Sequence, residues 1–314
     1  NKILHLKLIV ILENDIPLIF LPMCVKKINF AKVLTFLSSE VTDYNCPVCT
    51  KNLNININKF NQIWTELVNH IDYDVLFIDK IPEYLNDEKN PFFSNFFIAY
   101  QKTYLLNFKN FNFENFYLNK NNNKSIQTDR RKFKILRNSK LKITNQDLNL
   151  LQNHLIEKSK FYMKKGYKTF NPVLLNQFYL KILKTNNFDY LFSQMSCDNK
   201  VVSSIFGIIY GKIFYYLIPH VYESSLRKYS PGKYHLIELI KKYENSNISK
   251  IDFAPGDEDY KIKWSNQSYK IFYILKMKNY KSLIFYFKKK LYFILRKIRI
   301  IKKIKIYFNE IFYN

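Results

Sequence analysis

The segment Arg227–Trp264, RKYSPGKYHLIELIKKYENSNISKIDFAPGDEDYKIKW, decides the fold of this chain. It joins a glycine-containing turn, a helical pattern, a short apolar strand and an acidic cluster with a tyrosine and a lysine. Ser230-Pro231-Gly232 predicts a helix start, because serine caps helices, proline is tolerated in the first turn and glycine leaves the backbone accessible. Free N–H groups at a helix start bind anionic phosphate. The segment therefore predicts a phosphate-binding turn beside a reactive cluster.

The pattern around this segment predicts two helices, three antiparallel strands, and then alternating helix, strand, helix and strand. We expect helices at 146–164, 172–184, 230–243 and 257–264, and strands at 190–196, 201–210, 213–218, 250–253 and 270–276. A fainter copy precedes it, with strands at 6–12, 16–23, 32–36, 74–78 and 101–108, a helix at 60–71 and a helical turn at 91–97. The chain therefore reads as two similar halves.

The charge of the chain is strongly positive and unevenly placed. Hydrophobic residues make up 47% of the chain, and 50 Lys and Arg against 25 Asp and Glu give a net charge of +25. Such a charge ordinarily indicates an anionic partner. Lys, Asn, Ile, Phe and Tyr are all abundant, as AT-rich coding also produces, so the total is no evidence for nucleic acid. The segment Lys276–Lys305 is more informative, because it holds twelve Lys or Arg and no acid.

The spacing of the cysteines and the length of the apolar runs argue against a disulfide-bonded protein, a metal site and a membrane-spanning helix. Four cysteines in a chain of this length form no disulfide framework, which favours a reducing cytoplasm. The pair Cys46-x-x-Cys49 has no second pair or nearby His, so no metal is predicted. No run of about 18 uncharged apolar residues predicts a membrane-spanning helix. The chain begins with Asn1, and we expect its natural start to be missing.

Two motifs in the deciding segment resemble the GNAT acyltransferases. Arg227-x-x-Ser230-x-Gly232 resembles their Arg/Gln-x-x-Gly-x-Gly/Ala pyrophosphate loop, with serine where the first glycine stands. The residues 251–261 resemble the "DF…G-D/E-x-x-YK" motif of the CelD-like, FemAB-related branch. Weaker matches to that branch involve Thr128, Arg130, Arg131 and Leu136, and Asp43-Tyr44 with Cys46-Pro47.

This resemblance implies an α+β fold with a mixed sheet, made of two tandem GNAT-like halves and a basic helical tail. The implied boundaries are 1–108 for a first half truncated at its N-terminus, 109–275 for the acyltransferase half, and 276–314 for the tail. The tail mixes Lys and Arg with Ile, Leu and Phe, which is typical of a helix on an anionic membrane surface. Packing against the folded body explains the same apolar positions.

The resemblance also implies acetyl-CoA or another acyl-CoA as co-substrate, no metal, and direct transfer to an amine or hydroxyl, with a polysaccharide or cell-envelope precursor as acceptor. The implied cofactor-binding residues are Arg227, Lys228, Ser230, Gly232, Lys233 and Tyr234. The implied catalytic residues are Asp257 or Glu258 as general base, Tyr260 as acid for the thiolate, and Lys261 for the substrate or oxyanion. The implied substrate-binding residues are Asp252, His220, Arg130 and Arg131.

Each of these assignments has a structural alternative. The turn at Ser230 could be a helix cap alone, and Asp257 and Glu258 could serve only the helix dipole. Asp252 could cap the next turn, and Arg130-Arg131 could be a solvated helix face. Two other functions also stay open. One is a FemAB-like aminoacyl-tRNA-dependent peptidyl transferase, the only case in which we expect nucleic acid, and the other is an inactive GNAT-fold binding module. We expect a cytoplasmic protein, peripheral to the inner membrane.

Overall fold

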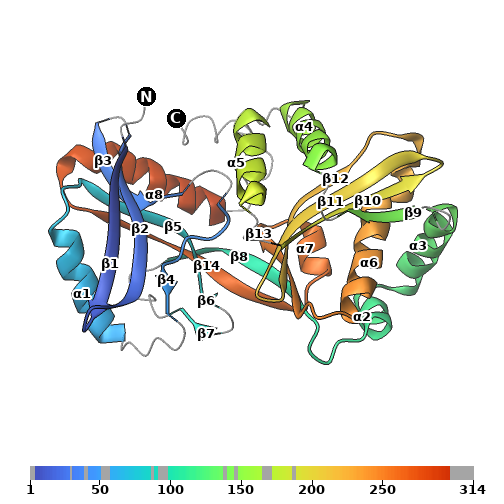
Figure 1. Cartoon of the computed structure of the whole chain (residues 1–314), viewed down its shortest axis with the longest axis horizontal. Helices are drawn as coiled ribbons and strands as arrows, with labels where there is room; N and C mark the ends of the chain where they lie inside the picture. Colours follow the sequence, from blue (N-terminus) through green and yellow to red (C-terminus); the bar gives the residue numbers. More distant parts are fainter. Residues whose placement is uncertain are drawn as a thin grey trace. The chain divides into compact units, whose positions relative to one another are not determined.

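The computed structural model describes residues 4–28, 30–38, 42–50, 57–85, 88–90, 98–136, 140–144, 148–164, 172–185 and 189–297 (Figure 1). The chain divides into two compact units. Unit 1 comprises Asn1–Lys102 and Tyr269–Asn314, and unit 2 comprises Thr103–Ser268. The helical turn predicted at 91–97 and the tail beyond residue 297 lie outside the described residues. No helix in the described part of the chain is long and apolar enough to cross a membrane.

Unit 1 is built on a mixed sheet. Its strands, in spatial order, are β1 (Leu4–Glu13), β2 (Ile16–Ile28), β3 (Ala31–Phe36), β5 (Val75–Pro82) and β14 (Gln267–Met277). Pairing is antiparallel except between β3 and β5, which run parallel. A tight turn joins β1 and β2 because Asn14 and Asp15 both adopt positive φ, as a two-residue hairpin requires. The short strands β4 (Val48–Cys49), β6 (Tyr84–Leu85) and β7 (Glu88–Lys89) complete the unit.

The two faces of the unit 1 sheet are covered by different helices. α1 (Ile57–Asn69) buries Phe60 and Val68 in a cluster with Met23, Leu34 and Leu76. On the opposite face, after the short helix η2 (Tyr280–Ser282), α8 (Leu283–Lys297) buries Phe285 and Phe293 against alternate residues of β3, β5 and β14. The period-two alternation of the strands therefore supplies both cores.

Unit 2 has a sheet of similar plan. Its strands, in spatial order, are β9 (Lys140–Thr144), β10 (Asp189–Cys197), β11 (Lys200–Tyr210), β12 (Ile213–Val221), β13 (Lys250–Pro255) and β8 (Ile98–Asn107). Pairing is antiparallel except between β12 and β13, which run parallel. Positive φ at Asp198, Asn199, Gly211 and Lys212 forms the two hairpin turns.

Helices cover both faces of the unit 2 sheet. α4 (Leu148–Lys164) and α5 (Pro172–Lys184) lie on one side of β10–β12, and α6 (Pro231–Glu244) lies on the other (Figure 1). α6 buries Leu236, Ile237, Leu239 and Ile240 against the strands. The remaining helices are α2 (Phe113–Lys120), α3 (Asn123–Leu136), η1 (Ser225–Tyr229) and α7 (Asp259–Lys263). The predicted α+β class with two tandem mixed-sheet halves is confirmed.

The last strand of each sheet comes from the other half of the sequence. β14 follows the unit 2 elements along the chain, yet its residues 271–277 pair with β5 of unit 1. β8 follows the unit 1 elements, yet Leu105, Leu106 and Asn107 pair with β13 of unit 2. Domain boundaries at 108 and 275 would put β8 in the first half and β14 in the second. The hydrogen bonds instead join β8 to unit 2 and β14 to unit 1.

Candidate active site

The central feature of unit 2 is a gap between two parallel strands. β12 and β13 pair only at their first three residues, from Ile213↔Lys250 to Tyr215↔Asp252. Beyond this point β12 continues to Val221, and none of its described residues pairs with β13. A pocket of about 600 Å³ is lined by residues of this part of β12 and of α4, β11, the 227–233 loop, α6 and α7. The end of β12 that has left β13 therefore forms part of the pocket wall.

A bulge in β12 opens this space to both faces of the sheet. The register with β11 shifts between Phe206↔Ile218 and Gly207↔Tyr216, which leaves Leu217 as the extra residue. Before the bulge, Tyr216 packs in the α6 core. After it, the His220 ring lies 5.8 Å from the ring of Phe161 on α4. Bulges redirect side chains in this way near functional sites. The pocket is accordingly lined both by α4 and by α6.

The loop before α6 forms one end of the pocket. Ser230 adopts φ 59° and ψ 51°, the left-handed conformation that favours glycine. Its carbonyl accepts the N–H groups of Lys233 and Tyr234, at 3.0 and 3.2 Å. Pro231 has no N–H. Among the described residues of this turn, the Gly232 amide is therefore the one backbone N–H that can donate a hydrogen bond to a ligand. The loop thus offers one free amide at the positive end of a helix.

Gly232 also has a packing role. A Cβ on this residue would lie 2.6 Å from Cγ2 of Val221, the last residue of β12. Glycine therefore permits the first turn of α6 to approach the end of the strand closely, in addition to exposing its amide.

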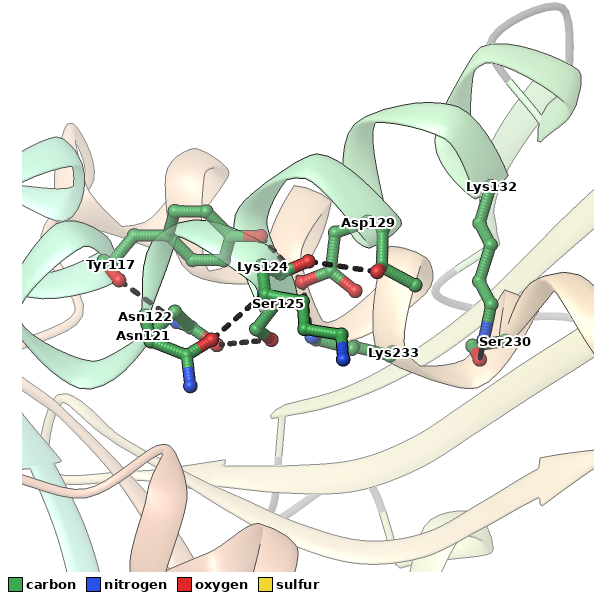
Figure 2. A network of polar contacts seen from close by, with 10 residues as sticks. Tyr117, Asn121, Asn122, Lys124, Ser125, Asp129, Lys132, Ser230 and Lys233 are labelled. Carbon is green, nitrogen blue, oxygen red and sulfur yellow. Dashed lines mark hydrogen bonds and ion pairs between the residues drawn. The ribbon is translucent and has the colours of Figure 1, made fainter.

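Two lysines and a buried carboxylate make polar contacts at the 227–233 loop (Figure 2). Lys132 of α3 donates to the Ser230 hydroxyl at 3.4 Å. Lys233 pairs with the carboxylate of Asp129, which also accepts from the Tyr117 hydroxyl. Asp129 and Lys132 were not predicted as site residues. Their i, i+3 spacing places them on one face of α3, so the sequence could have suggested that they act together. It could not have shown that both contact the 227–233 loop.

The rim of the pocket has an excess of positive charge. Arg227, Lys233 and Lys263 line it. Arg227 has an exposed partner, Glu223, at 3.7 Å. Burial and, secondarily, the charge of Lys233 lower the pKa of Lys263 from its usual value, with Asp129 opposing the shift. A bound anion would reduce this repulsion between cations.

Tyr260 of α7 lines the other side of the pocket. Burial is the main cause that raises its pKa, and Tyr216 and Glu258 add to the shift. Its hydroxyl has no hydrogen bond to any residue that the structure describes, and it is not a fully buried atom. The phenol therefore stays protonated and is available to donate to a ligand.

His220 faces the α4 side of the pocket. Burial lowers its pKa to about 4, with Lys158 and Arg227 contributing in the same direction and Glu157 opposing them. The ring lies 4.6 Å from the ring of Tyr222 and 6.1 Å from that of His154. Beside it, the ammonium of Lys158 donates to the carbonyl of Pro219. His220 is thus neutral near pH 7, and the burial and cations that lower its pKa make it a weak base.

Of the predicted cofactor-binding residues, four line the pocket: Arg227, Ser230, Gly232 and Lys233. The two others lie elsewhere. The Lys228 ammonium is 5.2 Å from the Tyr229 ring centroid, and the Tyr234 ring packs 4.9 Å from that of Phe133.

Of the predicted catalytic residues, only Tyr260 lines the pocket. Asp257 and Glu258 are exposed. The buried ammonium of Lys261 bonds the carbonyls of Ala254 and Pro255, at 3.3 and 3.1 Å, and pairs with Glu258 at 3.2 Å. This cluster therefore holds the turn between β13 and α7.

Of the predicted substrate-binding residues, only His220 lines the pocket. Asp252 accepts the amide of Ala254 at 2.7 Å and the Thr103 hydroxyl at 3.3 Å, so it holds the end of β13, where Ala254 has a positive φ. Arg130 and Arg131 lie on the exposed side of α3. No group of three or more His, Cys, Asp or Glu gathers among the residues that the structure describes.

Comparison with known proteins assigns the fold. Residues 120–262 match the family described as the acetyltransferase (GNAT) domain. FemX is similar over 86% of this chain and 88% of its own, at 11% identity and a TM-score of 0.53. The C-terminal domain of an Agrobacterium fabrum protein described as a lysylphosphatidylglycerol synthetase covers 89% of this chain and 85% of its own, at 8% identity and a TM-score of 0.53. L-PGS from Bacillus licheniformis covers 89% of this chain and 86% of its own, at 7% identity and a TM-score of 0.51.

The search of curated proteins gives no match. Residues 120–262 thus match the GNAT domain, and the chain has a fold like that of FemX, in agreement with the GNAT resemblance drawn from its motifs.

Proposed function

We propose that this protein is an acyltransferase that takes the acyl group from an acyl-CoA and passes it to an amine or hydroxyl. The observation behind the proposal is the pocket lined by the end of β12 beyond its pairing with β13, with the 227–233 loop at one end. CoA has a diphosphate joined to a long, thin thioester arm. In this proposal the Gly232 amide and Arg227, with Lys132 beside Ser230, bind the diphosphate, and the pocket holds the arm.

We infer that the acceptor approaches from the α4 side, where His220 lies. The nitrogen or oxygen of the acceptor attacks the thioester carbonyl, and as the new bond forms its proton becomes acidic and passes to His220. The carbon–sulfur bond breaks, and Tyr260 gives its proton to the departing thiolate. Most of the rate enhancement in such a reaction comes from holding donor and acceptor in contact. A saccharide or cell-envelope precursor is the proposed acceptor, following the branch that the 251–261 motif resembles.

Calorimetric titration with acetyl-CoA tests the donor. Arg227→Glu is expected to weaken binding about tenfold or more, because a carboxylate replaces a cation at the pocket rim. Lys228→Glu is the matched control, since it makes the same charge change one residue away and outside the pocket lining. Equal losses of acetyl-CoA affinity in the two variants would show that only the overall charge of the protein matters. If the unmodified protein does not bind acetyl-CoA, acyl-CoA is rejected as the donor.

A second candidate is an aminoacyl-tRNA-dependent transferase. It is supported by the likeness to FemX, to the domain described as from a lysylphosphatidylglycerol synthetase and to L-PGS, each over more than four-fifths of this chain. The same calorimetric experiment with charged tRNA separates the two donors. Saturable tRNA binding that Arg227→Glu removes, without acetyl-CoA binding, would favour aminoacyl transfer.

A further inference from the structure

The helix α8 of unit 1 has two apolar sides. Its buried side places Phe285 and Phe293 on the sheet, with their rings 5.8 and 6.2 Å from the ring of Phe77. Phe293 also stacks on Tyr273 at 3.7 Å. This packing fixes which side of the helix faces the protein.

The outward side of α8 is apolar as well. Ile284, Phe287, Leu291 and Ile294 retain 64%, 57%, 48% and 47% of their surface exposed. At about 3.6 residues per turn they form one row, diametrically opposite Phe285, Lys289 and Phe293. We call this row of four residues the outer stripe. Surface helices usually present polar residues to solvent, so four adjacent large apolar side chains mark an interaction surface.

The charges around the outer stripe indicate the kind of partner. By the same helical geometry, Lys288 borders the stripe on one side and Lys290 on the other. From Lys276 to Lys297 the sequence contains eight Lys or Arg and no acid. Lys289 is directed inward, with its ammonium 4.9 Å from the Phe77 ring centroid. A straight apolar row with cations along both borders matches an anionic lipid surface, where apolar side chains enter the headgroup boundary and lysines stay at the phosphates.

We propose that α8 docks this protein on an anionic lipid bilayer, with the outer stripe inserted and Lys288 and Lys290 at the headgroups. This interaction is independent of the donor that the unit 2 pocket binds. It places the protein at a membrane surface and leaves the buried side of α8 unchanged.

Vesicle co-sedimentation of the full chain tests the proposal, with equimolar phosphatidylglycerol and phosphatidylcholine against phosphatidylcholine alone. Ile284→Ser/Phe287→Ser/Leu291→Ser is expected to reduce binding to the anionic vesicles at least tenfold. Lys288→Glu/Lys290→Glu is expected to reduce it by more than roughly fivefold for each lysine. Lys242→Glu/Lys270→Glu makes the same charge change at exposed positions on other elements and is expected to change binding little.

A fluorescent variant gives a second readout that does not depend on weakened binding. Phe287→Trp keeps a large apolar side chain in the outer stripe, and its emission is expected to shift to the blue with anionic vesicles and to be quenched by brominated lipid. Three results would overturn the proposal. The first is vesicle binding by the triple serine variant equal to that of the unmodified protein, which would leave only general attraction of polyanions. The second is conversion of a dimer into a monomer by that variant. The third is a loss of binding in the control pair as large as that in Lys288→Glu/Lys290→Glu.

Discussion

At the residue scale, the half-buried Tyr260 and the buried Tyr243 of unit 2 differ in what their hydroxyls can reach. Tyr260 lines the pocket, whereas the Tyr243 hydroxyl is buried without a hydrogen-bond partner in the described structure. Tyr260→Phe is expected to lower kcat by about tenfold to a hundredfold with little change in donor affinity, because the hydroxyl acts on the leaving thiolate. Steady-state kinetics together with donor titration measures the two effects separately.

Tyr243→Phe is the matched control for that change. Removing a buried, unpaired hydroxyl is expected to leave kcat unchanged and to raise the free energy of unfolding by about 1 kcal/mol. Urea denaturation measures the gain. A large loss of donor affinity in Tyr260→Phe would show that the phenol serves binding, and an unchanged kcat would remove it from the reaction.

At the scale of the elements, three buried histidines make the contacts of α4 and α6 with the sheet sensitive to acid. His154 on α4 donates from Nε2 to the Ile218 carbonyl at 3.0 Å. His235 on α6 lies between the hydroxyls of Ser193 and Ser203, at 2.7 and 2.8 Å. Burial lowers the pKa of His154 and His235 to about 3 and that of His220 to about 4. All three are therefore neutral in the folded protein near pH 7.

Because these folded pKa values lie below the unfolded value of about 6.5, the unfolded chain binds protons first as the pH falls. Stability is complete above pH ~6.5 and is lost as the pH decreases toward 4, by up to about 1.4 kcal/mol per pH unit for each histidine. Urea denaturation between about pH 7 and 5 should show this dependence of the unfolding free energy on pH. His235→Gln should reduce the slope by the contribution of one histidine. Stability that does not change over this range would contradict the neutral, buried assignment.

The elements also show how far the sequence could be interpreted. The helix predicted from Pro172 to Lys184 has those bounds, because proline starts it and the apolar period continues to the lysine. β9 and the bulge at Leu217 were not predicted, since they depend on how these strands pair with β10 and β11. α2 was not predicted either, because its sequence has only a weak helical period of apolar residues. The motif at 251–261 indicated the right turn but not the orientation of its side chains. Lys261 turns inward to two carbonyls, and of this segment Asp259 and Tyr260 line the pocket.

At the scale of the whole molecule, the exchanged strands decide which fragments can fold. A fragment of residues 109–275, cut at the boundaries that the sequence predicts, lacks the β8 residues Leu105 and Leu106, which are 3% and 0% exposed in the full chain. Their loss removes roughly 2 kcal/mol of burial each and leaves the edge of β13 unpaired. We expect this fragment to aggregate and residues 103–268 to remain monomeric. Size-exclusion chromatography and circular dichroism compare them, and equal behaviour would show that β8 is dispensable to unit 2.

The exchange also sets an order of events during synthesis on the ribosome. β8 ends at Asn107, and its partner β13 begins only at Lys250, so 143 further residues must be made before the pair can form. At about 5–20 residues per second this is a wait of roughly 7–30 s, during which an apolar strand has no partner. β5 waits longer still for β14. Neither sheet can close before nearly the whole chain has left the ribosome, so the nascent protein is expected to depend on factors that shield exposed strands until translation ends.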